Sequence, residues 1–338
     1  MRVLSTLFLA FLAGETHALY RDFGIPASNS VVDVRVFNTG FSTLVNEAHA
    51  FTLPVLPGRE TPTFPIYAFL LEHKTSGTRF VWDLEIRKDH LSFAPSVAQF
   101  FTSGVVTIAS ADKDVPELLQ DGGIALDTID NVFWSHSHFD HIGDMSKFPT
   151  PLAFDFVGHN VTKIDFEAAN LTFSGMKAVD YFGDGSFYLL DSPGHISGHM
   201  AALARVTPTS FVSLGGDTFH NAAEARPRPQ FQLNYPCPAH LVEEIKSSVS
   251  TDYFWSPYSR DGDPVAAQVS LEKIATFDSD PDFFVVVAHD ASLQESLPYF
   301  PESLNNWKET HLKDNTLWNF ANQTNPAFVF SPAVNHTM

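Results

Sequence analysis

Three histidines and one aspartate fall within six residues, directly after an apolar segment. Residues 129–135 (IDNVFWS) predict a buried strand, and its carboxyl end leads into His136-Ser-His138-Phe-Asp140-His141. Imidazole nitrogens bind borderline metal ions, and carboxylate oxygens complete or share the coordination. Because His136 and His138 are two residues apart, an extended or tightly turned backbone can aim both rings at one point. Asp140 and His141 lie just beyond and can address a second ion, so the cluster predicts a metal site.

This hexapeptide resembles the HxHxDH signature of the metallo-β-lactamase superfamily, and Gly143-Asp144 extends it to the common HxHxDHxGD form. Further ligand segments of that family each follow a strand. This sequence offers a similar segment at each expected place: residues 192–199 (SPGHISGH), 215–217 (GGD) and 287–290 (VAHD). All seven ligand types are therefore present in the family's order.

The resemblance covers residues 31–290 and implies an α/β fold, the αββα sandwich, with the metal site at one edge. It also implies two zinc ions. The first ion would take His136, His138 and His195, the second would take Asp140, His141 and His289, and Asp217 would bridge the two.

A hydrolytic mechanism follows from such a pair of cations, which lower the pKa of a bridging water and stabilise a developing oxyanion. Asp140 is the predicted catalytic residue, because it can orient the hydroxide and pass a proton to the leaving group. Asp144 and His199 are predicted to fix the tautomers of the ligand rings. His220 is either a substrate contact or a structural histidine.

The charge balance limits the partners. Lys+Arg number 20 and Asp+Glu number 39, which gives a net charge of −19. Such a chain repels phosphate backbones and anionic membrane surfaces. No segment after the N-terminal one approaches the length of a membrane span. We expect a small-molecule substrate, with no nucleic-acid or membrane partner; the sequence leaves the oligomeric state open.

The N-terminus has the features of a signal peptide. Arg2 precedes the apolar run 3–14, and small residues surround His17, so residues 1–18 predict a signal peptide and residues 19–338 a single secreted domain. Four glycosylation sequons support secretion: Asn160, Asn170, Asn322 and Asn335.

The single Cys237 excludes an intramolecular disulfide and is expected to be a buried apolar thiol. Most of the 32 Phe are expected in the core, and the others in an apolar substrate cleft.

Periodicity predicts the elements around the motifs. Residues 67–72 and 79–84 predict a hairpin, and residues 52–65, with four prolines, a loop that could cover a site. Further strands are predicted at 31–37, 152–157, 187–190, 201–206, 211–214 and 283–288, and helices at 115–120, 239–248 and 263–277. The segment after Asp290 has no clear assignment.

Two differences between this chain and other members of the superfamily narrow the expected substrate class. Antibiotic-degrading members commonly carry a cysteine where this chain has Asp217, and the segment after His289 is too short for the helical domain of glutathione-type thioester hydrolases. Three further segments resemble the acyl-homoserine-lactonase-like branch of the superfamily: residues 64–73 (FPIYAFLLEH), 82–89 (WDLEIRKD) and 113–119 (KDVPELL). We therefore expect a secreted fungal member of that branch. The sequence thus predicts a lactone-opening enzyme. The alternatives are a lactam or thioester hydrolase, an iron-dependent oxidoreductase, and a metal-binding protein without turnover.

Overall fold

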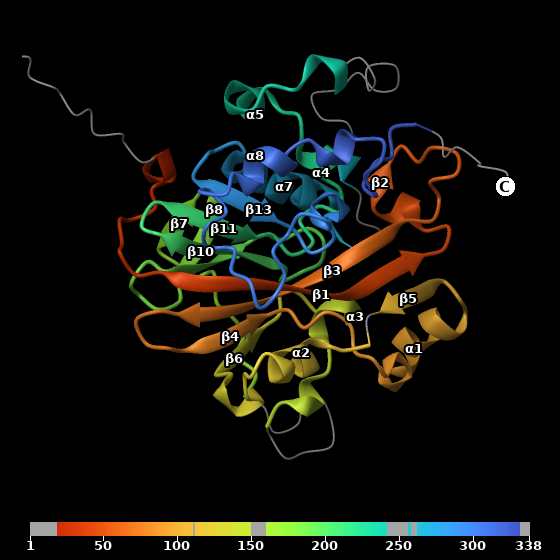
Figure 1. Ribbon diagram of the computed structural model, residues 1–338, viewed down its shortest axis with the longest axis horizontal. Coiled ribbons are helices and arrows are strands. Elements are labelled where there is room, and N and C mark those ends of the chain that lie inside the picture. The colour runs from red at the N-terminus through yellow and green to blue at the C-terminus, as the bar shows by residue number, and fades with distance from the viewer. Residues whose placement is uncertain (1–18, 111, 150–159, 242–255, 258–261, 332–338) are drawn as a thin grey trace, which may run out of the picture.

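The structure is a computed structural model that describes residues 19–110, 112–149, 160–241, 256–257 and 262–331. Two β-sheets pack face to face (Figure 1). The first has the order β5-β1-β3-β4-β6, with β1 Val32–Leu44, β3 Thr63–His73, β4 Arg79–Trp82, β5 Val106–Ser110 and β6 Asn131–Phe133. The second has the order β13-β11-β10-β9-β8-β7, with β7 Leu171–Phe173, β8 Met176–Asp180, β9 Phe187–Asp191, β10 Met200–Thr207, β11 Ser210–Leu214 and β13 Phe283–Val286.

The helices and short turns lie mainly outside these two layers (Figure 1). The α-helices are α1 Pro95–Thr102, α2 Val115–Asp121, α3 Phe139–Ile142, α4 Ala222–Ala225, α5 Pro229–Asn234, α7 Pro264–Asp278 and α8 Leu312–Thr316. The 3-10 turns are η1 Leu19–Phe23, η2 Ala48–Ala50, η3 His90–Ser92, η4 Leu126–Thr128, η5 Met145–Lys147, η6 Ala291–Leu293 and η7 Asn319–Ala321. Within the described part of the chain, no helix has the length and apolar character needed to cross a bilayer.

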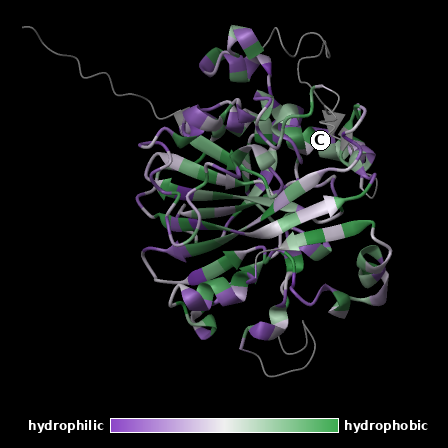
Figure 2. Ribbon diagram, turned by 45° about the vertical axis from the view of Figure 1, so that its right-hand side comes forward, coloured by the Kyte–Doolittle hydropathy of each residue, from purple (hydrophilic) through white to green (hydrophobic). Residues whose placement is uncertain are grey.

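Alternation along the strands divides the hydrophobic residues among three layers, because successive side chains of a strand point to opposite faces. On β9, Phe187 and Leu189 face the inter-sheet core, whereas Tyr188 and Leu190 face the outer cluster that α7 covers. A third cluster lies between the first sheet and α2. The strands carry most of the hydrophobic colouring in Figure 2. This arrangement confirms the predicted αββα sandwich.

Several predicted elements are confirmed, with altered ends. The hairpin is β3–β4, and helix α7 begins as expected: the Asp263 carboxylate accepts hydrogen bonds from the backbone N–H groups of Val265 and Ala266. Strand β1 continues to Leu44, because beyond a bulge after Asn38 it pairs with β5 as well as β3. Strand β6 is shorter than predicted, since the backbone N–H of Ser135 leaves the ladder to bond Asp83.

The prediction of a loop over residues 52–65 is wrong at both ends. Residues Thr52–Leu53 form β2, which pairs with β12 Ser256–Pro257, and β3 already begins at Thr63. Short strands among prolines give little periodicity, so the sequence pattern misses them. The strand expected at 152–157 and most of the helix expected at 239–248 lie outside the described residues, as do residues 1–18 and Asn335.

The segment after Asp290, which the sequence left unassigned, packs against both sheets. Leu304 and Trp307 enter the inter-sheet core, and the backbone N–H of Leu304 donates to the Val34 carbonyl of β1. Further along, Phe320 and Phe328 form a separate cluster with α4. This segment therefore contributes side chains to the core and to the cluster around α4.

Candidate metal centre

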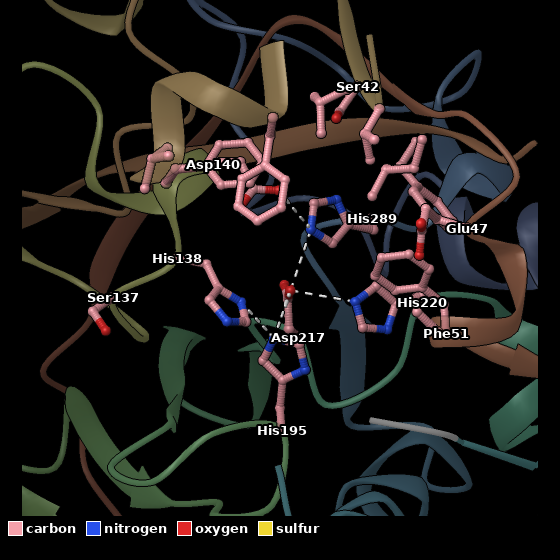
Figure 3. Close-up of a pocket in the computed structure, with 18 residues that line it drawn as sticks. Ser42, Glu47, Phe51, Ser137, His138, Asp140, His195, Asp217, His220 and His289 are labelled. Atoms are coloured by element: carbon pink, nitrogen blue, oxygen red, sulfur yellow. Dashed lines mark hydrogen bonds and ion pairs between the residues drawn. The ribbon is translucent and has the colours of Figure 1, made fainter. Parts of the chain in front are cut away.

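Four loops bring the predicted ligands together at one edge of the sandwich. They follow β6, β9, β11 and β13, and they supply the 136–141 cluster, His195, Asp217 and His289 respectively. Figure 3 shows that the labelled histidines surround the Asp217 carboxylate. All seven predicted ligands belong to groups of donor atoms that could hold a metal ion. These residues lie in four separate segments of the sequence, and the packing of the two sheets brings them together in one site.

The first ligand set consists of His136, His138, His195 and Asp217. The His138 Nδ1 atom lies 2.9 Å from Nε2 of His136 and 2.9 Å from Nε2 of His195. The Asp217 Oδ2 atom lies 3.3 Å from His195 Nε2 and 3.7 Å from His136 Nε2. In a tetrahedral zinc site with bonds of about 2.0–2.1 Å, neighbouring donors are about 3.3 Å apart. These spacings therefore suit one zinc-sized ion.

The second set consists of Asp140, His141 and His289, and Asp217 adjoins it. His289 Nε2 lies 3.5 Å from Asp140 Oδ2 and 3.3 Å from Asp217 Oδ2. His141 Nε2 faces Asp217 Oδ1 at 3.1 Å, yet both atoms are buried without a hydrogen-bond partner. Buried polar atoms without partners are costly, and a cation between these donors would satisfy them. The residues present therefore fit a metal ion here.

The electrostatic environment keeps the first ligand set in the protonation states that bind a cation. Burial lowers the pKa values of His136 and His195 well below the usual value, which keeps these rings neutral. Burial alone would raise the pKa of Asp217, but the neighbouring His141 and His289 hold it well below its usual value. Neutral imidazoles and an ionised carboxylate are the protonation states that bind metal.

Outer hydrogen bonds determine which nitrogen of each ring faces the site. His289 Nδ1 donates to the Pro65 carbonyl at 2.8 Å, so its Nε2 faces Asp217. His199 acts on the backbone: its Nδ1 donates to the Ser192 carbonyl at 2.8 Å, and its Nε2 accepts the Asp217 N–H at 2.9 Å. His199 therefore holds the backbone of the predicted ligand Asp217 and does not fix the tautomer of a ligand ring, as was predicted for it. A side chain on Gly216, at φ +52°, would meet His199 Nε2 at 2.7 Å, so the turn requires glycine.

Asp144 has a different place from the one predicted. Its carboxylate accepts the Ser146 backbone N–H at 3.1 Å and lies 3.7 Å from the Arg87 guanidinium. These contacts hold the turn after α3 instead of orienting a ligand ring. The prediction that Asp144 fixes a ligand's tautomer is therefore corrected.

The carboxylate that bonds the ring of a predicted ligand is Asp83, which was not among the predicted site residues. Asp83 is 1% exposed, and its Oδ2 atom accepts from His141 Nδ1 at 3.0 Å. The same carboxylate accepts the N–H and hydroxyl of Ser135 at 2.7 and 2.8 Å. Its backbone has φ +57°, a left-handed conformation that only a few residue types tolerate. The sequence signal was its position directly after an apolar strand in the segment WDLEIRKD.

His220 lies among the predicted metal ligands, next to Asp217. It is 5% exposed, and its Nε2 atom lies 3.3 Å from Asp217 Oδ2 without a hydrogen-bond partner. Its ring stacks on His289 with centroids 5.3 Å apart. The Glu224 carboxylate accepts the backbone N–H groups of His220 and Asn221 at 3.1 and 2.9 Å, so helix α4 holds this turn in place.

An apolar cavity opens over the ligands (Figure 3). It has a volume of about 230 Å³ and is lined by Phe51, Phe64, Phe100 and Phe139 together with several aliphatic residues. The Phe residues thus serve both the core and the cavity, as the sequence analysis expected. Cys237 is elsewhere: it is half-buried against an apolar cluster, and burial raises the pKa of its thiol to about 11.

Similarity to known proteins agrees with this site, although no family model matches the chain. The chain is 33% identical to the metallo-hydrolase mfmC of Annulohypoxylon moriforme, across 93% of this chain and 91% of that protein. It is 34% identical to the gamma-lactamase FDB1 of Fusarium pseudograminearum, across 89% and 84% of the two chains. It is also 36% identical to the cytochrome P450 monooxygenase mpaDE of Penicillium brevicompactum across 88% of this chain, but spans only 38% of that longer protein.

A solved structure shares the fold. The N-acyl homoserine lactone hydrolase with N-hexanoyl-L-homoserine at its catalytic metal center superimposes with a TM-score of 0.51, across 81% of this chain and 99% of that chain. The sequence identity is 17%, so this likeness concerns the fold alone. With full-length relatives above 30% identity and a His/Asp cluster suited to metal, the chain belongs to the metallo-β-lactamase superfamily and is a metal-dependent hydrolase.

Proposed function

We propose that the protein uses two zinc ions to hydrolyse an uncharged cyclic ester or cyclic amide. The observation that carries this proposal is the pair of ligand sets beneath an apolar cavity, with Asp217 in the first set and adjoining the second. His136, His138, His195 and Asp217 would hold the first ion, and Asp140, His141, His289 and Asp217 the second. The mixture of imidazole nitrogen and carboxylate oxygen suits zinc.

When bound, such an ion pair lowers the pKa of a water molecule and polarises a carbonyl group. The chain's own residues supply the rest. Asp140 is 15% exposed at its side chain and lines the cavity, so its carboxylate can accept a proton from water and return it to the leaving oxygen or nitrogen. His220 borders the same space, where its imidazole can contact the substrate. The surrounding Phe rings exclude bulk water, which strengthens the polar interactions inside.

The cavity lining favours a neutral substrate. Its acidic side chains include Glu47, Asp140 and Asp217, and none of its lining residues is Lys or Arg. Away from the proposed zinc ions, a substrate that carries phosphate or carboxylate groups would find no cationic side chain of Lys or Arg there. This disfavours thioesters of anionic carriers. We include lactams among the proposed substrates together with lactones, because the relative FDB1 is a gamma-lactamase that aligns over most of both chains.

For the cellular context, we propose secretion after removal of residues 1–18, with residues 19–338 as one glycosylated domain. The described sequon asparagines, Asn160, Asn170 and Asn322, are all exposed, which permits glycan attachment. N-terminal sequencing of protein from culture medium should begin near Leu19. An intact Met1 on intracellular protein would contradict secretion.

The experiment that tests the function combines metal analysis with a substrate panel. Purified protein should hold close to two equivalents of zinc and open lactones or lactams, while thioesters of anionic carriers should react slowly. Chelation should abolish turnover, and added zinc should restore it. A protein that binds no zinc would contradict the metal site, and a zinc-loaded protein inactive on the whole panel would contradict the substrate class.

A further inference from the structure

His220 lies beside the predicted ligands but belongs to neither of the two ligand sets. It follows Asp217 by three residues, beyond the GGD segment, so the family resemblance assigns it no place at the metal site. Its Nε2 atom lies 3.3 Å from Asp217 Oδ2, which is also the distance between His289 Nε2 and Asp217 Oδ2. Since His289 is a predicted ligand of the second ion, His220 presents its nitrogen at the spacing expected of a ligand.

The contact between His220 and Asp217 is not a hydrogen bond. The two atoms are close enough for one, yet the buried Nε2 atom of His220 has no hydrogen-bond partner. The other oxygen of the same carboxylate, Oδ1, is buried without a partner 3.1 Å from His141 Nε2, which has none either. An unpaired buried polar atom is costly, and a cation that binds the His220 nitrogen would remove that cost.

The ion that His220 can reach is the second one. His220 forms a group of possible metal donors with Asp217 and His289, and His289 also belongs to the group that supplies the second ligand set. An ion bound to His289 Nε2 is therefore the one that His220 can join. In the view of Figure 3, His220 and His289 lie on one side of the Asp217 carboxylate, and His138 of the first set lies on the other.

Contacts of the backbone and the ring hold His220 in this position. The Glu224 carboxylate accepts the backbone N–H groups of His220 and Asn221. The side chain of Asn221 in turn donates from Nδ2 to the Ala327 carbonyl at 3.0 Å. The Phe51 ring packs against the imidazole, with centroids 4.8 Å apart. A ligand that is already held in its binding position loses little conformational freedom when the ion binds, so these contacts favour coordination.

A contact with the substrate does not account for the buried nitrogen. His220 lines the cavity over the ligands, but its Nε2 atom is buried and faces Asp217. A substrate in the cavity would therefore meet another part of the ring. The imidazole can border the substrate and bind an ion at the same time.

We propose that His220 is an eighth protein ligand, which binds the second zinc ion through Nε2. The proposal rests on the proposed function, because it requires that ion. The second ion would then have three imidazoles, from His141, His220 and His289, besides the carboxylates of Asp140 and Asp217. Imidazole suits zinc, whereas carboxylates suit manganese and magnesium, so His220 should make the second site more selective for zinc.

The test is a zinc titration of His220→Phe in competition with a chromophoric chelator. Phenylalanine keeps a ring against Phe51 and removes the nitrogen. One of the two zinc equivalents should bind at least about tenfold more weakly, because a ligand should contribute no less than a residue that orients ligands, for which about 10–100-fold is typical. The other equivalent should keep its affinity, and the weakened site should lose part of its preference for Zn²⁺ over Mn²⁺.

His73→Phe is the matched control. His73 is also a buried histidine, 4% exposed, and its ring stacks on Phe182 with centroids 4.1 Å apart. Its ring nitrogens contact Ser76 and Asp184, which are not predicted ligands. The substitution therefore removes a buried, stacked imidazole away from the metal site and should leave both zinc affinities unchanged.

The outcomes separate this inference from the proposed function. If folded His220→Phe binds both zinc equivalents with wild-type affinity, the ligand role is overturned and the proposed function stands. Wild-type protein that binds no zinc would overturn the proposed function, and the inference with it. If thermal unfolding shows that His220→Phe does not fold, a crystal structure of the zinc-loaded wild-type protein decides. His220 Nε2 should then lie about 2.0–2.1 Å from the second ion, and a distance beyond about 3 Å would overturn the ligand role.

Discussion

Asp83→Asn is the substitution that most directly tests how the outer residues hold the metal site. The Asp83 carboxylate accepts a hydrogen bond from His141 Nδ1, so that His141 Nε2 carries a lone pair towards Asp217 and Asp140. Asparagine has the same shape and tolerates the left-handed backbone at φ +57°. Its oxygen can still accept the Ser135 N–H. The fold should therefore survive, and the change is confined to one charge and one acceptor.

The expected loss is one of metal affinity. An amide N–H that faces His141 Nδ1 would force the proton onto Nε2, where it competes with the metal ion. Residues that orient metal ligands typically contribute about 10–100-fold in affinity, or about 1.4–2.7 kcal/mol. The removed bond is buried and charge-assisted, so we expect a value near the upper end of that range. Turnover at saturating zinc should fall less than zinc affinity does.

The measurement is a zinc titration in competition with a chromophoric chelator, alongside thermal unfolding of the metal-free protein. Asp282→Asn is the matched control: Asp282 is also buried, at 6% exposure, and accepts a backbone hydrogen bond from Tyr20, but it lies away from the ligands. It should leave zinc affinity unchanged. Zinc affinity of Asp83→Asn within twofold of wild type, with the fold intact, would refute the orienting role of Asp83.

Asp217→Ala should release at least one zinc and abolish turnover, because two cations would face each other without the shared carboxylate; metal analysis showing both ions retained would contradict the bridge. Asp140→Asn should lower kcat about 10²–10⁴-fold, most on substrates with poor leaving groups, and a uniform loss that follows metal content would make Asp140 a ligand alone. Burial raises the pKa of Glu224 from 4.5 to about 8, so the folded state holds a proton that the unfolded state has lost. The free energy of unfolding should therefore decrease as pH rises from about 4.5 to 8, by an amount on the order of a few kcal/mol, and Glu224→Gln should flatten this dependence in denaturant titrations; an unchanged slope would assign it to other groups.

The ligand residues could be predicted from the sequence because their signal is local. His136, His138, Asp140 and His141 stand within six residues, and Asp217 follows two glycines at a strand end. Few other arrangements would place so many metal-binding side chains after apolar strands. Periods of two residues and 3.6 residues predicted individual strands and helices, because they report which face is buried, and the resemblance to the metallo-β-lactamase superfamily implied the sandwich.

The residues that support the site could not be found in this way. Asp83 is 58 residues from His141, and Asn221 is 106 residues from the Ala327 carbonyl that it bonds. Asp144 was predicted to fix a ligand's tautomer from its place in the HxHxDHxGD form and instead holds a turn, whereas the position of Asp83 after an apolar strand did not indicate what it contacts. Both are acidic residues beside apolar segments, and only the path of the backbone decides which one reaches an imidazole.

The sequence by itself thus predicted the fold class and the residues that could hold a metal ion, because the motifs that carry the family resemblance depend on residue type and short-range spacing. The tertiary structure decided which carboxylate bonds the His141 ring, where His220 lies, and that residues 326–329 and the residue 48–63 segment line a second cavity beside Phe64. These features depend on contacts between segments distant in the chain. Such contacts are fixed only when the two sheets pack and the loops at their edge meet.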